Sequence, residues 1–96
     1  MRLPKNVAAQ TLEKQALRSG TSVAANYREA CRSRSNNEFV AKLGIVEREL
    51  DETLLWLELI VEAGIVSEST MASLKSEAEE LLKITIASIR TAKRRT

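Results

Sequence analysis

One stretch of this chain limits its possible folds more than any other, namely residues 36–64, NNEFVAKLGIVERELDETLLWLELIVEAG. Its apolar residues recur at steps of three or four, which places them on one face of a helix. They are Phe39, Leu43, Val46, Leu50, Leu54, Leu57 and Val61. After Thr53 the apolar surface widens, and a helix that is apolar on several sides needs neighbours on several sides. The stretch therefore predicts the central helix of a bundle.

The ends of this central helix are marked by residues that start and stop helices. Ser35 or Asn36 can cap its start, and Gly64 can end it because glycine takes the left-handed C′ conformation at low cost. A helix between these points is about 40 Å long at 1.5 Å per residue. The 96 residues contain only three Gly and one Pro, which favours long helices and argues against a β fold.

Two flanking segments also follow a helical pattern. The first starts near Val7, with Asn6 as a candidate N-cap, and runs to about residue 31. The polar residues 19–22 interrupt it, so it is either one kinked helix or two helices with a break. The apolar stripe resumes at Val23, which favours the kinked helix. The last segment is capped by Ser67 and closes with Lys93, Arg94 and Arg95 beside the negative end of the helix dipole.

The connections between these segments are short, which makes neighbouring helices antiparallel. We therefore expect one domain over residues 1–96 with an all-α fold, an antiparallel up-and-down helical bundle. Cys31 is the only cysteine, so no intrachain disulfide can form and a reducing compartment is expected. The start of the chain lacks the apolar core of a signal peptide, and no apolar run is long enough to span a membrane. We therefore expect a soluble, cytoplasmic protein.

Charge is distributed unevenly along the chain, although the net charge is only +2. Residues 1–35 carry seven Lys or Arg against two acids, residues 36–80 three against eleven, and residues 81–96 five against none. Antiparallel packing brings many of the cations to one end of the bundle, called the basic end below. Its residues are Arg28, Arg32, Arg34, Arg90, Lys93, Arg94 and Arg95.

The basic end has two readings. Clustered Lys and Arg neutralise phosphates, which makes these seven residues the candidate nucleic-acid-binding residues. Cations at the end of a helix also complement its dipole without binding anything. The sequence contains no histidine, so the usual Ser–His and Cys–His pairs of nucleophilic enzymes are absent. The carboxylate pairs Glu47/Asp51 and Glu58/Glu62 fit a solvated acidic face better than a metal site. We expect no enzymatic activity, no cofactor and no metal.

Several short pieces of the chain carry a family resemblance. They are Leu-Arg-Ser-Gly-Thr-Ser-Val at residues 17–23, Ala-Asn-Tyr-Arg-Glu-Ala at 25–30, Phe39, Glu52 and Glu-Ala-Gly at 62–64. In this order and spacing they resemble the four-helix-bundle proteins of the 23S rRNA intervening-sequence protein family, from about Leu3 to Arg95. The resemblance implies a small all-α protein that assembles into a homopentamer, with no enzymatic activity. A related branch serves diversity-generating retroelements, where a basic pentamer holds a reverse transcriptase and its RNA.

The chain departs from this family at its start. Members have a further helix before the Leu-Pro that corresponds to Leu3-Pro4, where this chain begins. Either the start was assigned too late, or the protein works with three helices and has lost the first family helix. Its loss leaves apolar surface uncovered, which favours self-association into a homo-oligomer. On the central helix, Leu55, Trp56, Leu59 and Ile60 form the candidate oligomer interface, unless they pack inside the chain's own bundle.

One further group within the resemblance has two interpretations. Tyr27 can stack on a base while Arg28 contacts phosphate, or Tyr27 packs inward, Asn26 bonds locally and Arg28 pairs with Glu38. The leading function is a non-enzymatic oligomeric scaffold that binds structured RNA or a ribonucleoprotein through the basic end. The alternative is a purely protein–protein interaction module that docks a partner such as a polymerase.

Overall fold

The computed structural model describes residues 5–95, with side chains from residue 7 onward, and contains three α-helices and no strand in that range. They are α1 (Lys5–Cys31), α2 (Asn36–Glu62) and α3 (Glu68–Arg94), each of 27 residues. The predicted all-α fold is confirmed. The Leu3-Pro4 pair lies outside the described residues.

Helix α1 is one continuous helix across residues 19–22, as the favoured interpretation predicted, and the alternative of two helices with a break is wrong. Its polar side chains bond back to the preceding turn: the Thr21 hydroxyl donates to the Leu17 carbonyl (2.7 Å) and the Ser19 hydroxyl to the Ala16 carbonyl (3.2 Å). These hydroxyls therefore do not end the helix. The helix starts at Lys5, which puts Asn6 inside its first turn, so the predicted N-cap role of Asn6 is wrong.

The predicted starts and stops of the other two helices are confirmed. The Ser35 hydroxyl accepts a hydrogen bond from the Glu38 amide (3.1 Å) at the start of α2, and Ser67 accepts one from the Thr70 amide (3.2 Å) at the start of α3. Each bond satisfies an amide that has no partner inside its helix. Gly64 follows α2 with φ +74°, the left-handed conformation in which the chain turns towards α3.

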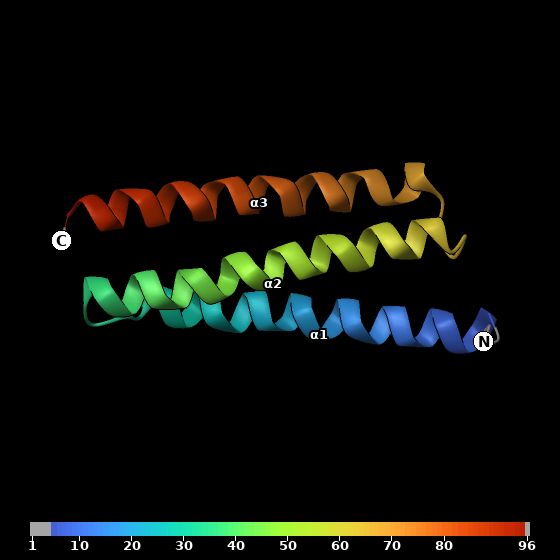
Figure 1. The fold of residues 1–96 in the computed structure, drawn as a ribbon, viewed down its shortest axis with the longest axis horizontal. Helices are drawn as coiled ribbons and strands as arrows, with labels where there is room; N and C mark the ends of the chain where they lie inside the picture. Colours follow the sequence, from blue (N-terminus) through green and yellow to red (C-terminus); the bar gives the residue numbers. More distant parts are fainter. Residues whose placement is uncertain (1–4, 96) are drawn as a thin grey trace.

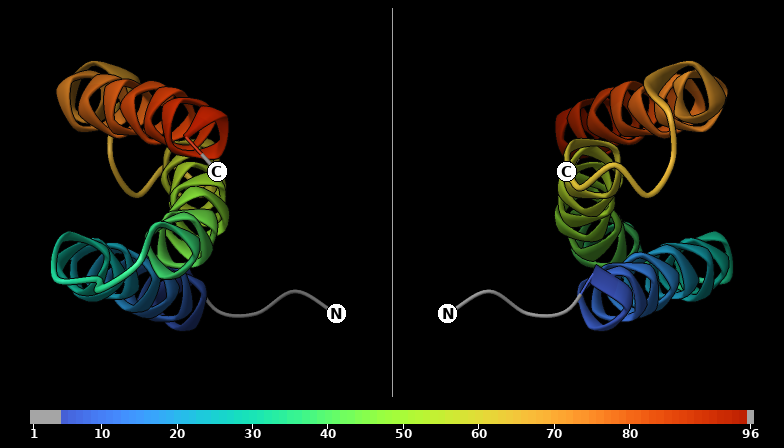
Figure 2. Two further views of the ribbon diagram at one scale, coloured as in Figure 1. Left: turned by 90° about the vertical axis from the view of Figure 1, so that its left-hand side faces the viewer. Right: turned by 90° about the vertical axis from the view of Figure 1, so that its right-hand side faces the viewer.

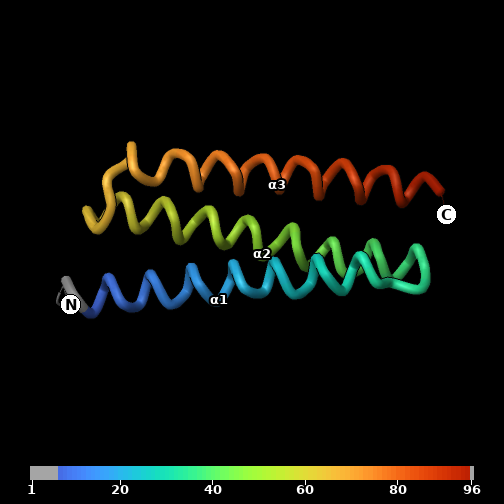
Figure 3. The backbone as a smooth tube through the Cα atoms, turned by 180° about the vertical axis from the view of Figure 1, so that it is seen from behind, coloured from blue at the N-terminus to red at the C-terminus, as the bar shows by residue number. Residues whose placement is uncertain are grey.

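The three helices run up, down and up along a rod whose extents are 50 × 22 × 20 Å (Figure 1). Helices α1 and α3 both pack on α2, and within residues 5–95 no Cα atom of α1 lies within 8 Å of a Cα atom of α3. Seen from either end, the helices therefore form a C with α2 at its middle (Figure 2). The view from behind shows the same order, with α2 between its two neighbours over most of the rod and overlapping the end of α1 near the turn (Figure 3). The antiparallel arrangement is confirmed, and no fourth helix is present in the described range.

The core divides into two clusters along α2. One cluster gathers Ala30 of α1 and Leu43, Val46 and Leu50 of α2, with partly buried side chains of all three helices around it. The other gathers Leu57 and Ile60 of α2 with Met71 of α3. The apolar stripe that predicted the central helix thus supplies most of the buried surface. None of the helices in the described part of the chain is long and apolar enough to cross a membrane.

Candidate nucleic-acid interface

The basic end is built from two helix ends and one helix start. The last turns of α1 and α3 and the first turn of α2 all lie at the same end of the rod (Figure 1). The predicted residues are placed there, all exposed: Arg28, Arg32, Arg34, Arg90, Lys93, Arg94 and Arg95. The cations lie beside the C-termini of two helices, where the dipoles favour positive charge.

A long-range hydrogen bond fixes the two sides of this end relative to each other. The Asn36 side-chain amide donates to the Ala92 carbonyl at 2.7 Å, which joins the start of α2 to the last turn of α3. Ala92 itself is buried. The Ala92 carbonyl also accepts from the Arg95 backbone amide at 3.1 Å, so the Asn36 amide is its second donor at the end of α3. Neither residue belonged to the predicted site, because nothing in their local sequence relates positions 56 residues apart.

Few acids oppose these cations. Among residues 5–95, none of the six arginines of the basic end has a carboxylate within 4.0 Å, so the predicted Arg28–Glu38 pair is wrong. Glu38 instead lies near the turn, where its carboxylate accepts from the Arg34 amide at 3.5 Å. Exposed arginines without acidic partners keep their full capacity to bind phosphate oxygens.

The nearest acid on α1 is neutralised by a lysine of α2. The Lys42 ammonium lies 2.8 Å from the Glu29 carboxylate. The hydrogen bond to Glu29, followed by the attraction of its negative charge, raises the pKa of Lys42 above the ordinary value of 10.5, against a smaller effect of burial. The pair removes a negative charge that would otherwise weaken the field of the basic end.

The cations form two groups, because the backbones of α1 and α3 stay more than 8 Å apart. An open hollow of about 710 Å³ separates them, with Arg34 from the turn on one side and Arg95 from the end of α3 on the other. Cys31 also lines this hollow and is exposed. Such an end offers two clusters of positive charge to phosphates, the contacts that position a nucleic acid. This division could not be predicted from the sequence.

Acidic residues gather at the opposite end of the rod. Glu58 and Glu62 lie in the last turns of α2, and Glu68 lies in the first turn of α3. Lys75 reaches Glu58 at 3.6 Å and offsets part of this charge. The rod therefore carries opposite charge at its two ends.

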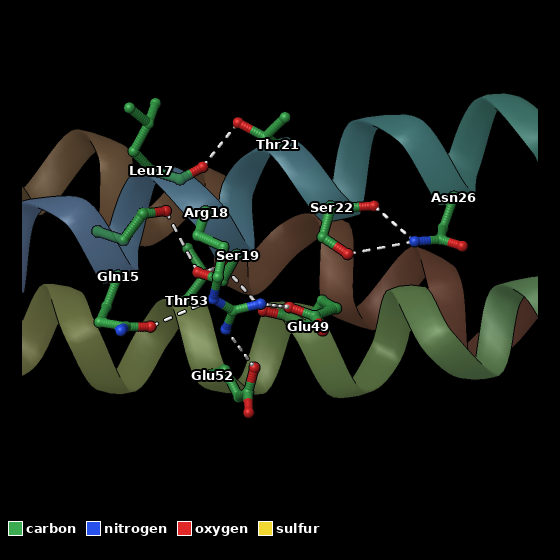
Figure 4. A network of polar contacts seen from close by, with 11 residues as sticks. Gln15, Leu17, Arg18, Ser19, Thr21, Ser22, Asn26, Glu49, Glu52 and Thr53 are labelled. Atoms are coloured by element: carbon green, nitrogen blue, oxygen red, sulfur yellow. Dashed lines mark hydrogen bonds and ion pairs between the residues drawn. The ribbon is translucent and has the colours of Figure 1, made fainter.

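The motif at residues 17–23 joins α1 to α2 (Figure 4). The Arg18 guanidinium reaches the Glu52 carboxylate at 3.2 Å and the Glu49 carboxylate at 3.6 Å. Ser19 is fully buried beside Thr53, with 2.9 Å between the two hydroxyl oxygens. Glu52 therefore helps to hold α1 against α2 through its ion pair with Arg18.

For Asn26 and Tyr27 the sequence predicted a local hydrogen bond and an inward-facing ring, and only the first of these is found. The Asn26 amide donates to the Ser22 carbonyl at 2.9 Å, so its predicted local bond is confirmed (Figure 4). Tyr27 is 48% exposed rather than packed inward, because α3 is too far from α1 to cover it. Stacking of Tyr27 on a base stays a prediction.

The four predicted interface residues have different surroundings. Ile60 is 5% exposed and belongs to the chain's own core with Leu57 and Met71. Leu55 is 48% exposed, whereas Trp56 and Leu59 are half-buried. The indole N–H of Trp56 is buried and has no hydrogen-bond partner among the described residues. Leu55 is therefore the most accessible of the four for a neighbouring subunit.

No metal centre is evident in the described part of the chain. Residues 5–95 contain no group of three or more His, Cys, Asp or Glu side chains that could hold a metal ion. The buried Glu49 oxygen, which accepts no hydrogen bond in this range, faces the Arg18 guanidinium instead.

Comparison with known proteins gives the chain its family. The model of the 23S rRNA-intervening sequence protein family matches residues 1–87. A crystal structure of a protein of unknown function from the S23 ribosomal protein family of Bacteroides thetaiotaomicron VPI-5482 is similar, with 38% sequence identity and a TM-score of 0.78. The similarity covers 81% of this chain and 72% of that one. No curated protein matches the chain. This chain belongs to the family of 23S rRNA-intervening sequence proteins.

Proposed function

We propose that this protein is a non-enzymatic, homo-oligomeric scaffold that binds structured RNA or a ribonucleoprotein through its basic end. One observation supports this proposal above the others. Seven exposed cations gather at one end of the rod, and none of the six arginines among them is paired with a carboxylate in the described range. Unpaired surface charge of one sign attracts a polyanion and raises its association rate.

The mechanism is neutralisation of phosphates. Each cation that meets a phosphate releases condensed counterions, so affinity falls steeply as salt concentration rises. Two separated clusters, on either side of the hollow at Arg34 and Arg95, favour contacts with more than one stretch of backbone. Because such contacts carry no sequence information, RNAs of the same shape and different sequence should bind alike.

The proposal is tested with a fluorescein-labelled RNA hairpin, titrated by fluorescence anisotropy at about 50 and 200 mM salt. Six or more phosphate contacts should lower the affinity about a thousandfold between these salt concentrations. A second hairpin of scrambled sequence and equal length should bind with the same affinity. No binding at the lower salt would refute the proposal and direct attention to a protein partner, such as a polymerase.

A charge-matched pair of variants assigns the binding to the basic end. Arg94→Glu/Arg95→Glu should abolish binding of the hairpin. Arg48 and Lys83 are also exposed, but they lie in the middle of α2 and α3. Arg48→Glu/Lys83→Glu changes the net charge by the same amount and should leave most of the affinity. Equal losses in the two double variants would show that net charge, not the basic end, governs binding.

Self-association is the second part of the proposal, because more chains per particle bring more basic ends to one RNA. Two apolar surfaces can form the contact: the outer side of α2 around Leu55, and the space between α1 and α3. They differ in the subunit number that they allow. A ring of five, which the family resemblance implies, needs a head-to-tail contact, whereas a self-complementary contact gives pairs.

A further inference from the structure

The open hollow at the basic end has room for more than phosphate groups. Its volume of about 710 Å³ lies within the range of about 300–1,000 Å³ that is usual for the binding pockets of small ligands. The last turns of α1 and α3 form its sides, and the first turn of α2 lies between them (Figure 1). Cations that only neutralise phosphates act from an exposed face and need no hollow. The shape of this end therefore indicates a further part of the ligand.

Apolar side chains line this hollow where a ligand can reach them. Ile84 of α3 is 50% exposed, and Phe39 of α2 is partly buried against the core while it also lines the hollow. Proteins hold unpaired RNA bases by stacking them on aromatic rings or on the planes of arginine guanidinium groups. Phe39 supplies a ring, and Arg34 and Arg95 supply guanidinium planes. An unpaired base is the part of an RNA that suits these side chains.

Two arginines stand on opposite sides of the hollow and come from different elements. Arg34 belongs to the turn between α1 and α2, and Arg95 follows the end of α3. The 2.7 Å hydrogen bond from the Asn36 amide to the Ala92 carbonyl joins these two sides, so their separation is fixed before a ligand binds. A nucleotide inside a strand has a phosphate on each side of its sugar. Two cations around one apolar lining therefore match such a nucleotide better than a free phosphate.

Hydroxyl groups in the hollow can reach the edge of a base. Among residues 5–95, the side chains of Ser88 and Thr91 have no hydrogen-bond partner, and both line the hollow. The Ser33 hydroxyl donates to the Glu29 carbonyl at 3.2 Å and can still accept a bond. A hydroxyl both donates and accepts, so it can pair with the edge of any base. The hollow therefore selects an unpaired base without selecting its identity.

We propose that the hollow binds one unpaired nucleotide of an RNA, at a bulge or in a loop. The base lies against Phe39 and Ile84, and the phosphates on its two sides meet Arg34 and Arg95. A paired base cannot enter, because it is stacked inside the A-form helix and its edges lie in grooves that side chains read poorly. This inference rests on the proposed function and names the feature of the RNA that the basic end binds.

Three fluorescein-labelled RNA probes test the proposal by anisotropy at about 50 mM salt. The first is a fully paired duplex, the second is the same duplex with one unpaired adenosine, and the third has an abasic ribose in place of that adenosine. The second and third probes carry the same charge. The adenosine bulge should bind about five- to a hundredfold more tightly than the abasic bulge, which is the range measured for one stacked base. A uridine bulge should bind with nearly the affinity of the adenosine bulge.

The outcomes separate this inference from the proposed function. Equal affinities for the adenosine and abasic bulges would overturn the unpaired-nucleotide site, whereas salt-sensitive binding of all three probes would still support phosphate neutralisation. Absence of binding by every probe at low salt would refute both. A strong preference for adenosine over uridine would contradict the hydroxyl argument and show that the site reads base identity.

A neutral pair of variants places the base in the hollow. Ile84→Gln removes an apolar contact without a change in charge, so it should lower the preference for the adenosine bulge over the abasic bulge about fivefold. Leu74→Gln is the matched control, because Leu74 is 52% exposed on the same helix and lies outside the hollow. Equal preferences in the two variants would refute this placement. Circular dichroism checks their helicity, and the probe comparison with the unaltered chain needs neither variant.

The single cysteine reports directly whether the hollow is occupied. Cys31 lines the hollow and is exposed, so N-ethylmaleimide should alkylate it in the free protein. A saturating amount of the adenosine-bulge probe should slow this alkylation more than a saturating amount of the abasic probe, since only the base fills the hollow. Equal protection by the two probes would place the base elsewhere and overturn the proposal.

Discussion

The hydroxyl pair between α1 and α2 allows a prediction whose size follows from its geometry. Ser19 is 0% exposed, and the Thr53 hydroxyl donates to it at 2.9 Å. Each hydroxyl also has a partner on its own helix, the Ala16 carbonyl at 3.2 Å for Ser19 and the Glu49 carbonyl at 2.7 Å for Thr53. A hydroxyl has one proton, so Thr53 donates to one acceptor at a time. Removal of either hydroxyl therefore leaves the other with a partner.

This redundancy sets the expected cost of removing one hydroxyl. Ser19→Ala should lower the free energy of unfolding by about 1 kcal/mol, the net worth of an ordinary hydrogen bond, and not by the larger penalty of an unsatisfied buried group. Thr53→Val should cost a similar amount. Because both changes remove the same bond between helices, the double variant should lose less than the sum, with a coupling energy of about 0.5–1 kcal/mol.

The assay is urea unfolding followed by the fluorescence of Trp56, the only tryptophan. All variants are compared at one protein concentration, because self-association makes apparent stability depend on concentration. Thr21→Ala is the matched control: its hydroxyl bonds only within α1, at the Leu17 carbonyl, so it should be additive with Thr53→Val. A coupling near zero between Ser19 and Thr53, or a loss of more than about 3 kcal/mol in Ser19→Ala, would contradict this reasoning.

Three further predictions concern single positions. Leu43 lies in the core and is 1% exposed, so Leu43→Ala should lower the free energy of unfolding by about 2–5 kcal/mol, measured by urea unfolding. The pKa of Lys42, followed by NMR, should lie above its ordinary value of 10.5 and should fall in Glu29→Gln, because Glu29 is the main cause of the rise. Since this pKa is raised on folding, its contribution is present at neutral pH and is lost as pH rises through the folded pKa, and solvent keeps it small. Ser67→Ala removes the N-cap of α3 and should lower the free energy of unfolding by about 1 kcal/mol, seen as a lower melting temperature. Ser73→Ala, at an exposed position inside α3, should change the melting temperature little.

Local patterns predicted the helices well. The stripe from Phe39 to Val61 and the caps at Ser35 and Ser67 depend on neighbours within a few residues, and Gly64 takes the positive φ that was expected of it. The interruption at residues 19–22 was harder to interpret. Its hydroxyls can either start a new helix or bond back to the preceding turn, and the burial of Ser19 against α2 decides in favour of the second.

Distances between helices were not available from the sequence. The basic residues were expected at one end, and the order of short connections was enough to place them there. The separation of α1 from α3 is a tertiary property, and it explains why Tyr27 is half exposed and why the cations form two groups. The sequence predicted Ile60 at a subunit interface, because it lies where the apolar surface of α2 widens. In the structure Ile60 packs in the core against Met71 of α3 instead.

The arrangement of α1, α2 and α3 in a row has a consequence for how the chain unfolds. Since the backbones of the outer helices stay more than 8 Å apart in the described range and both pack on α2, stability resembles that of a short repeat array, a sum of helix terms and two neighbour terms. Either outer helix can open while the remaining hairpin stays folded. Hydrogen exchange should therefore show separate opening events for α1 and α3, and the amides of α2 should exchange last. A destabilising change in α3 should speed exchange in α3 and leave the rate in α1 unaltered.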